Sequence, residues 1–190
     1  MKQIGLAVAN YHASYNVYPP AFTTDAAGKP LHSWRVLILP YMEQQKLYDK
    51  IRLDEPWDSA ANSLLHDQMP QLFSFHGEHR PGKLVTNYLA VVGPGTMWPG
   101  GECRKDSEIK DELSDTILVV EDLDLKVHWM QPRDHPAEAL EPESLTSKYE
   151  APAAVMADGL VIELKTPIDA NLLDATLTVS GQESIDPSKL

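Results

Sequence analysis

Residues 153–164 read AAVMADGLVIEL, and this stretch decides the fold. Two short apolar runs, 153–157 and 160–164, flank the dipeptide Asp158-Gly159. Asp-Gly between two such runs is a strong hairpin signal, because a type I′ turn needs positive φ at both central residues. The sequence therefore predicts an antiparallel hairpin that turns at Asp158 and Gly159.

Two segments upstream of this hairpin predict further strands. Residues 84–92 (LVTNYLAVV) are rich in strand-forming residues, and residues 116–120 (TILVV) form a short apolar run typical of a buried strand. Residues 122–150 are polar, acidic and punctuated by prolines, which predicts a surface excursion with a short helix at 137–140.

The first 18 residues show the periodicity of a helix that ends before Pro19 and Pro20. Its apolar stripe, spaced by three or four residues, consists of Ile4, Val8, Tyr11 and Tyr15. No Ser, Thr, Asp or Asn precedes the stripe as an N-cap. This helix either begins upstream of Met1 or is an ordinary frayed terminus.

Two more helical stretches precede the strands. One covers residues 33–51, with Ser33 as N-cap and an interruption at Pro40, and the other extends from 58 or 59 to 72. Helices first and strands later indicate an α+β fold with an antiparallel sheet rather than alternating βαβ units. The length of 190 residues favours one domain.

Composition excludes several classes of function. The chain has 16 Lys and Arg against 28 Asp and Glu, a net charge of −12, which disfavours binding to nucleic acid or to anionic lipid. A single cysteine, Cys103, permits no internal disulfide and no thiolate zinc cluster. Within this sequence, no apolar run is long enough to span a membrane.

Two groups of residues are weak candidates for binding. His76 and His79 have a spacing found in zinc sites, although such sites need a third ligand. Three tryptophans with faces suited to stacking on a sugar are Trp57, Trp98 and Trp129, for which burial in the core is the competing role. No catalytic motif has the required spacing, so the sequence predicts neither a catalytic residue nor a cofactor.

Several segments in a fixed order carry a resemblance to a known family. They are residues 2–7 (KQIGLA), 18–21 (YPPA), 33–37 (SWRVL), 40–45 (PYMEQQ), 54–59 (DEPWDS), 86–96 (TNYLAVVGPGT) and 157–159 (ADG). Together they resemble bacterial prepilin-like proteins of unknown function, which have an N-terminal cleavage and methylation segment and a C-terminal H-x9-DG motif. The histidine of that motif corresponds to Lys148 in this chain, so Asp158-Gly159 is expected to act as a structural turn.

The resemblance implies a pilin-like fold, with an N-terminal helix packed on an antiparallel sheet with additional helices. Residues 1–190 would form a single head domain, with 1–18 as the end of a longer helix and 180–190 as a frayed tail. The missing upstream helix would anchor the protein in the cytoplasmic membrane after cleavage by a prepilin peptidase. The head domain would then lie in the periplasm or outside the cell.

These implications lead to two functional hypotheses. The first is a non-enzymatic pseudopilin-like domain that binds other pilin-like subunits or secretion and cell-surface components. Its acidic head is expected to be a monomer or weak dimer by itself. The alternative is an extracytoplasmic solute- or glycan-binding module that uses the three tryptophans.

Overall fold

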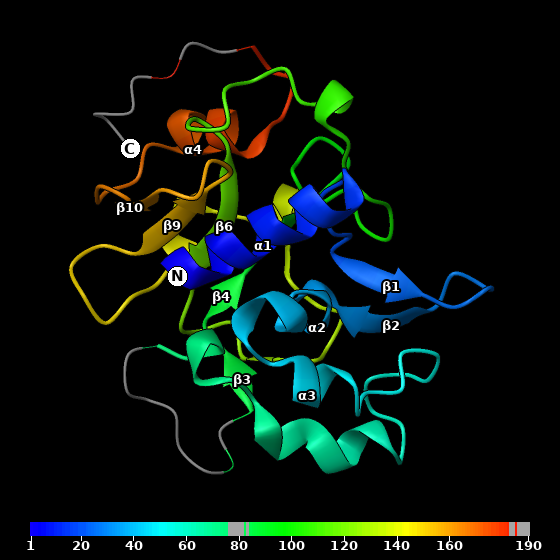
Figure 1. Cartoon of the computed structure of the whole chain (residues 1–190). Coiled ribbons are helices and arrows are strands. Elements are labelled where there is room, and N and C mark those ends of the chain that lie inside the picture. Colours follow the sequence, from blue (N-terminus) through cyan, green and yellow to red (C-terminus); the bar gives the residue numbers. More distant parts are fainter. Residues whose placement is uncertain (76–81, 83, 183–184, 186–190) are drawn as a thin grey trace.

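The computed structural model describes residues 1–75, 82, 84–182 and 185, and it is a mixture of helices and mainly antiparallel strands (Figure 1). The α-helices are α1 (Lys2–Tyr15), α2 (Trp34–Leu37), α3 (Gln45–Tyr48) and α4 (Ala170–Leu177). The 3₁₀ helices are η1 (Leu39–Met42), η2 (Asn62–Gln68), η3 (Gln71–Phe73), η4 (Asp106–Glu108), η5 (Ala137–Ala139) and η6 (Pro142–Ser144). The strands are β1 (Phe22–Thr24), β2 (Pro30–Ser33), β3 (Val85–Thr86), β4 (Tyr88–Leu89), β5 (Val91–Val92), β6 (Ile117–Glu121), β7 (Val127–His128), β8 (His135–Pro136), β9 (Ala153–Met156) and β10 (Val161–Glu163). The predicted α+β class is confirmed.

The central sheet is antiparallel and has the strand order β10-β9-β6-β4. Strand β6 lies inside it, paired with β9 through Val119 and Val155 and with β4 through Glu121 and Tyr88. Every residue of β6 is buried, as its run of β-branched and aliphatic side chains predicts.

The predicted hairpin is present, but its turn is not type I′. Met156 N–H donates to the Leu160 carbonyl at 2.8 Å, which leaves a three-residue loop, and within it only Gly159 has a positive φ, 88°. Gly159 N–H donates to the Met156 carbonyl at 2.9 Å, as in a type I turn followed by a left-handed glycine. The longer loop lets Asp158 N–H reach the Leu113 carbonyl at 3.2 Å.

The strand predicted over residues 84–92 is divided into three pieces. Strand β3 pairs with β7, β4 with β6, and β5 runs parallel to β8. The breaks fall where backbone groups bond elsewhere. Asn87 N–H donates to the Phe73 carbonyl at 3.1 Å, and Ala90 N–H donates to the Asp134 carboxylate at 2.8 Å.

The helical predictions need similar corrections. Helix α1 ends at Tyr15 because Asn16 adopts a left-handed conformation, with φ 56°, and donates to the His12 carbonyl. The stretch 33–51 is divided into α2, η1 and α3, although Ser33 caps α2 as predicted. The stretch 58–72 contains the 3₁₀ helix η2 and most of η3 instead of one α-helix, and α4 was not predicted.

Residues 122–150 are more than a surface excursion. They carry β7 and β8 and bury large side chains in the core, namely Trp129, Met130, Leu140 and Leu145. The short helix predicted at 137–140 is the 3₁₀ helix η5.

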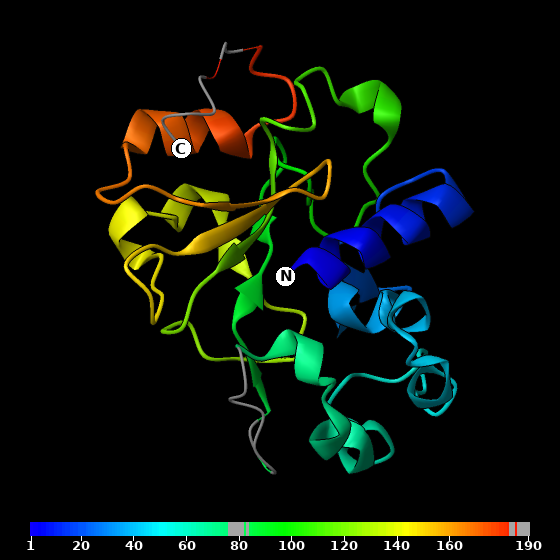
Figure 2. The same ribbon diagram turned by 60° about the vertical axis from the view of Figure 1, so that its left-hand side comes forward.

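Helices and turns lie on both faces of the sheet (Figure 2), and apolar side chains form a core on each face. On one face, α1, α2 and the neighbouring turns pack around Trp34, Trp98 and Val155. On the other face, α4 and the turns η5 and η6 pack around Val120 and Ala154. Within the described residues, none of the helices combines the length and apolar content that crossing a bilayer requires.

Candidate functional site

The first candidate site is α1, which packs against β9. Of the predicted stripe, Ile4 and Val8 are fully buried and Tyr11 is half-buried. The prediction is wrong for Tyr15, which is 60% exposed. Its ring instead contacts Tyr11, with ring centroids 4.6 Å apart.

Gly5 permits the close approach between α1 and the hairpin. A Cβ at this position would lie 2.8 Å from Val155 Cγ1 and 3.3 Å from Gly159 Cα. A glycine in a helix interior costs about 1 kcal/mol relative to alanine, so its presence here is explained by packing. Gly159, which was predicted as a turn residue, therefore also lies where α1 packs against the hairpin.

On its outer side, α1 borders a groove that we call the α1 groove. It has a volume of about 440 Å³ and is lined by Lys2, Gln3, Gly5, Leu6, Ala9, Asp158, Gly159 and Leu160. Leu6 and Leu160 are both 60% exposed. Helix α1 thus has one face packed against the sheet and an exposed face that carries the large apolar side chain of Leu6.

The tryptophans do not form a stacking platform. Trp98 and Trp129 are 1% and 0% exposed, so the prediction that they stack on a ligand is wrong. Their indole N–H groups are bonded internally, Trp98 to the Leu118 carbonyl at 2.6 Å and Trp129 to the His66 carbonyl at 2.9 Å. Trp57 is half-buried and its ring stacks on His66.

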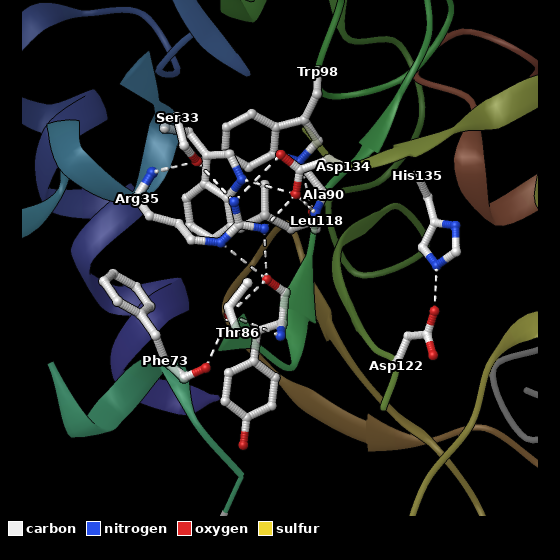
Figure 3. A network of polar contacts seen from close by, with 12 residues as sticks. Ser33, Arg35, Phe73, Thr86, Ala90, Trp98, Leu118, Asp122, Asp134 and His135 are labelled. Carbon is white, nitrogen blue, oxygen red and sulfur yellow. Dashed lines mark hydrogen bonds and ion pairs between the residues drawn. The ribbon is translucent and has the colours of Figure 1, made fainter. Parts of the chain in front are cut away.

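A buried charge pair that the sequence analysis missed joins the helices to the sheet (Figure 3). The Arg35 guanidinium bonds the Asp134 carboxylate, and its Nη1 donates to Ser33 Oγ at 2.7 Å. Arg35 Nη2 also donates to the Tyr88 carbonyl at 2.8 Å. Asp134 Oδ1 accepts from Ala90 N–H at 2.8 Å and from Trp34 Nε1 at 3.3 Å.

This network is a structural feature rather than catalytic machinery. Burial lowers the pKa of Arg35 and raises that of Asp134, and the attraction between the two charges opposes both shifts. The side chains are 0% and 2% exposed, so a substrate has no access to them. The two residues are 99 positions apart in the sequence, so local sequence patterns could not indicate the pair.

A second buried pair lies nearby, between His135 and Asp122 (Figure 3). His135 Nε2 donates to Asp122 Oδ2 at 2.8 Å, and Thr146 Oγ1 donates to Asp122 Oδ1 at 2.9 Å. Although burial raises it, the hydrogen bonds from His135, the Asp124 amide and Thr146 hold the pKa of Asp122 below its ordinary value. The bond from Thr146 to Asp122 joins the two ends of the 122–146 segment, and the bond from His135 joins its middle to Asp122.

No metal centre is evident in the part of the chain that the structure describes, where no group of three or more His, Cys, Asp or Glu could hold an ion. The weak candidates His76 and His79 lie outside the described residues, so that prediction stays untested. A neighbouring pair, His66 and His128, has ring centroids 4.2 Å apart. His128 Nδ1 accepts from Met130 N–H at 3.2 Å, which leaves the proton on Nε2 and makes this ring unsuited to ligation.

The fold and site thus define an α+β protein in which one face of the N-terminal helix packs against an antiparallel sheet. Residues 1–81 are similar to a family described as a protein of unknown function (DUF1559). This match covers α1 to η3 and ends before the central sheet. No curated protein and no solved structure matches the chain.

Proposed function

We propose that this chain is the extracytoplasmic head of a non-enzymatic, pseudopilin-like protein that assembles with other pilin-like subunits or cell-surface components. The observation that carries the proposal is α1, which buries Ile4 and Val8 against the sheet and leaves Leu6 exposed. The similarity of residues 1–81 to a family commonly seen in bacterial pilin-like proteins supports it.

The proposed mechanism is physical rather than chemical. An upstream apolar segment of about 20 residues would hold the subunit in the bilayer. The exposed face of α1 would then contact a neighbouring subunit, and the small residue Ala9 at the α1 groove would allow close approach beside Leu6. The net charge of −12 disfavours association of heads alone, so contact would depend on the aligned helices.

The first test is membrane fractionation of the full-length native protein, with and without its prepilin peptidase, followed by mass analysis of the N-terminus. We expect a trimmed, membrane-held product only when the peptidase is present. An untrimmed or freely soluble product would overturn the pilin-like proposal.

The second test asks which face meets a neighbour. A photo-crosslinking residue is placed at Leu6 in the full-length protein, and the matched control is Leu64, an exposed leucine on η2 with 77% exposure. We expect subunit-to-subunit crosslinks from position 6 that exceed those from position 64 several-fold. Equal yields from the two positions would contradict a contact through α1.

The alternative function, a solute- or glycan-binding module, now rests on different residues. Of the three tryptophans, only Trp57 is not fully buried. The cavity beside the start of α1, which is lined by Phe75, Tyr88 and Tyr149 and by none of the three tryptophans, favours the solute form of this alternative.

A further inference from the structure

A cavity of about 330 Å³ lies where the chain around β8 passes the start of β1 and the end of β5. Its volume falls at the lower end of the range of roughly 300–1,000 Å³ that is typical of small-molecule pockets. We call it the Phe22 cavity. Apolar side chains form much of its wall, namely those of Phe22, Val92, Pro132 and Pro136.

The backbone holds this apolar wall in place. Val92 on β5 is the strand partner of Pro136 on β8, and a proline ring fixes its own backbone φ. The Phe22 ring lies close to Gly101, where a Cβ would be 3.3 Å from Phe22 Cε2. The cavity therefore exists before a ligand binds, which lowers the cost of ordering its wall.

Two buried pairs fix the chain directly after Arg133. The carboxylate of Asp134 bonds Arg35, and the ring of His135 bonds Asp122 (Figure 3). Asp134 also borders the cavity, but its side chain is 2% exposed and already bonded, so it takes no part in binding a ligand. The role of these pairs here is to hold the backbone that carries Arg133.

Two exposed side chains of opposite charge, Arg133 and Glu138, also line the Phe22 cavity. Within the described part of the chain, neither side chain takes part in an ion pair or a side-chain hydrogen bond, with the other or with a third residue. A guanidinium can donate two parallel hydrogen bonds to a carboxylate, and a carboxylate accepts from an ammonium group. The cavity thus offers one accessible charge of each sign beside an apolar wall.

We propose that the Phe22 cavity binds free α-amino acids that have an apolar side chain. Arg133 pairs with the carboxylate of the amino acid, Glu138 pairs with its ammonium group, and its side chain packs against Phe22 and Val92. A ligand that has only one of the two charges forms only one of the two ion pairs, so the cavity favours the zwitterion. The proposal does not depend on the assembly of α1 with other subunits.

The test compares L-leucine with two analogues that each lack one charge. 4-Methylpentanoate lacks the ammonium group, and 3-methylbutylamine lacks the carboxylate. Each compound is titrated into the protein while backbone NMR shifts are followed at Val92 and Glu138. We expect saturable shifts with leucine and an affinity at least about fivefold higher than for either analogue, the upper range for an exposed ion pair. Shifts that do not saturate with leucine, or an analogue that binds as tightly, would overturn the proposal.

Two variants then assign the charges. Arg133→Gln should weaken leucine binding about fivefold and leave the binding of 3-methylbutylamine unchanged, because that compound has no carboxylate. Glu138→Gln should weaken leucine binding to a similar extent and leave the binding of 4-methylpentanoate unchanged. Both side chains are exposed, so we expect both variants to fold. If either variant binds leucine as tightly as the parent, the proposed pairing is wrong.

The matched controls are Arg52→Gln and Glu143→Gln, which remove the same charges away from the cavity. The Arg52 side chain is 64% exposed, and Glu143 lies in the first turn of η6 as Glu138 does in η5. Leucine affinity in both controls should equal that of the parent. If the controls lose as much affinity as the cavity variants, leucine responds to the overall charge of the protein and the Phe22 cavity is not its site.

Discussion

Single residues in this protein carry interactions that join distant parts of the chain. Arg35 alone bonds Ser33, Tyr88 and Asp134, and Asp134 in turn bonds Ala90. A buried charge pair is weak evidence for net stability, because desolvation opposes the attraction. The loss of one partner is nevertheless costly, since the other charge is then left buried without compensation.

For this reason we expect Asp134→Asn and Arg35→Met each to lower the free energy of unfolding by about 3–5 kcal/mol. Urea denaturation monitored by tryptophan fluorescence measures the change. The double variant Arg35→Met with Asp134→Leu should lose less than the sum of the two single losses, because no lone charge remains. Strictly additive losses would contradict the proposed pairing.

His128 predicts how the protein responds to acid. Burial and the neighbouring His66 lower the pKa of His128 to about 4, against about 6.5 in an unfolded chain. The fold therefore favours the neutral ring. Its contribution to stability is complete above about pH 6.5, falls as the pH drops towards 4, and is constant below that.

Between pH 7 and pH 4 we expect His128 to account for a loss of about 1–3 kcal/mol in unfolding free energy, after allowance for partial exposure. His128→Phe removes this titration, so its stability should fall less over the same range. The comparison uses urea denaturation at each pH. If the two proteins lose equal stability, His128 does not titrate as described.

At the scale of elements, the close packing of α1 against β9 depends on the absence of a side chain at Gly5. Gly5→Ala would improve helix propensity by about 1 kcal/mol but would place a Cβ 2.8 Å from Val155 Cγ1. We expect overpacking to dominate, with a net loss of about 1–3 kcal/mol in unfolding free energy, measured by thermal or urea denaturation.

The double variant Gly5→Ala with Val155→Ala provides the control for this prediction. Removing the Val155 methyl groups relieves the contact, so the cost of Gly5→Ala should be smaller in the Val155→Ala background than in the parent. If its cost is the same in both backgrounds, α1 does not meet β9 at this contact.

Elements specified by neighbouring residues were the ones that could be predicted. The hairpin around Gly159, the buried strand β6 and the N-cap at Ser33 all depend on interactions within a few positions. The breaks in residues 84–92 could not be foreseen, because they depend on hydrogen bonds that backbone amides donate to the Phe73 carbonyl and the Asp134 carboxylate. The turn type was missed because the loop also bonds Leu113.

At the scale of the whole molecule, candidate sites could likewise be predicted only where they depend on residues close together in the sequence. The α1 stripe was predictable as far as Tyr11, and the prediction failed at Tyr15 because periodicity does not show how far along a helix the packing extends. Trp98 and Trp129 belong to a residue type that often forms binding surfaces, but both side chains are buried in the core. The cavity beside the start of α1 is lined by residues of α1, β6 and β10, so no local motif could have indicated it.

The Arg35–Asp134 pair also bears on the order in which the chain becomes structured during synthesis. Arg35 leaves the ribosome 99 residues before its partner, and α1 precedes the β9 strand that seats it by an even longer interval. Until those later residues emerge, the early helices have neither their countercharge nor their sheet. A fragment cut at the end of the region of family similarity, residues 1–81, would leave Arg35 without its partner.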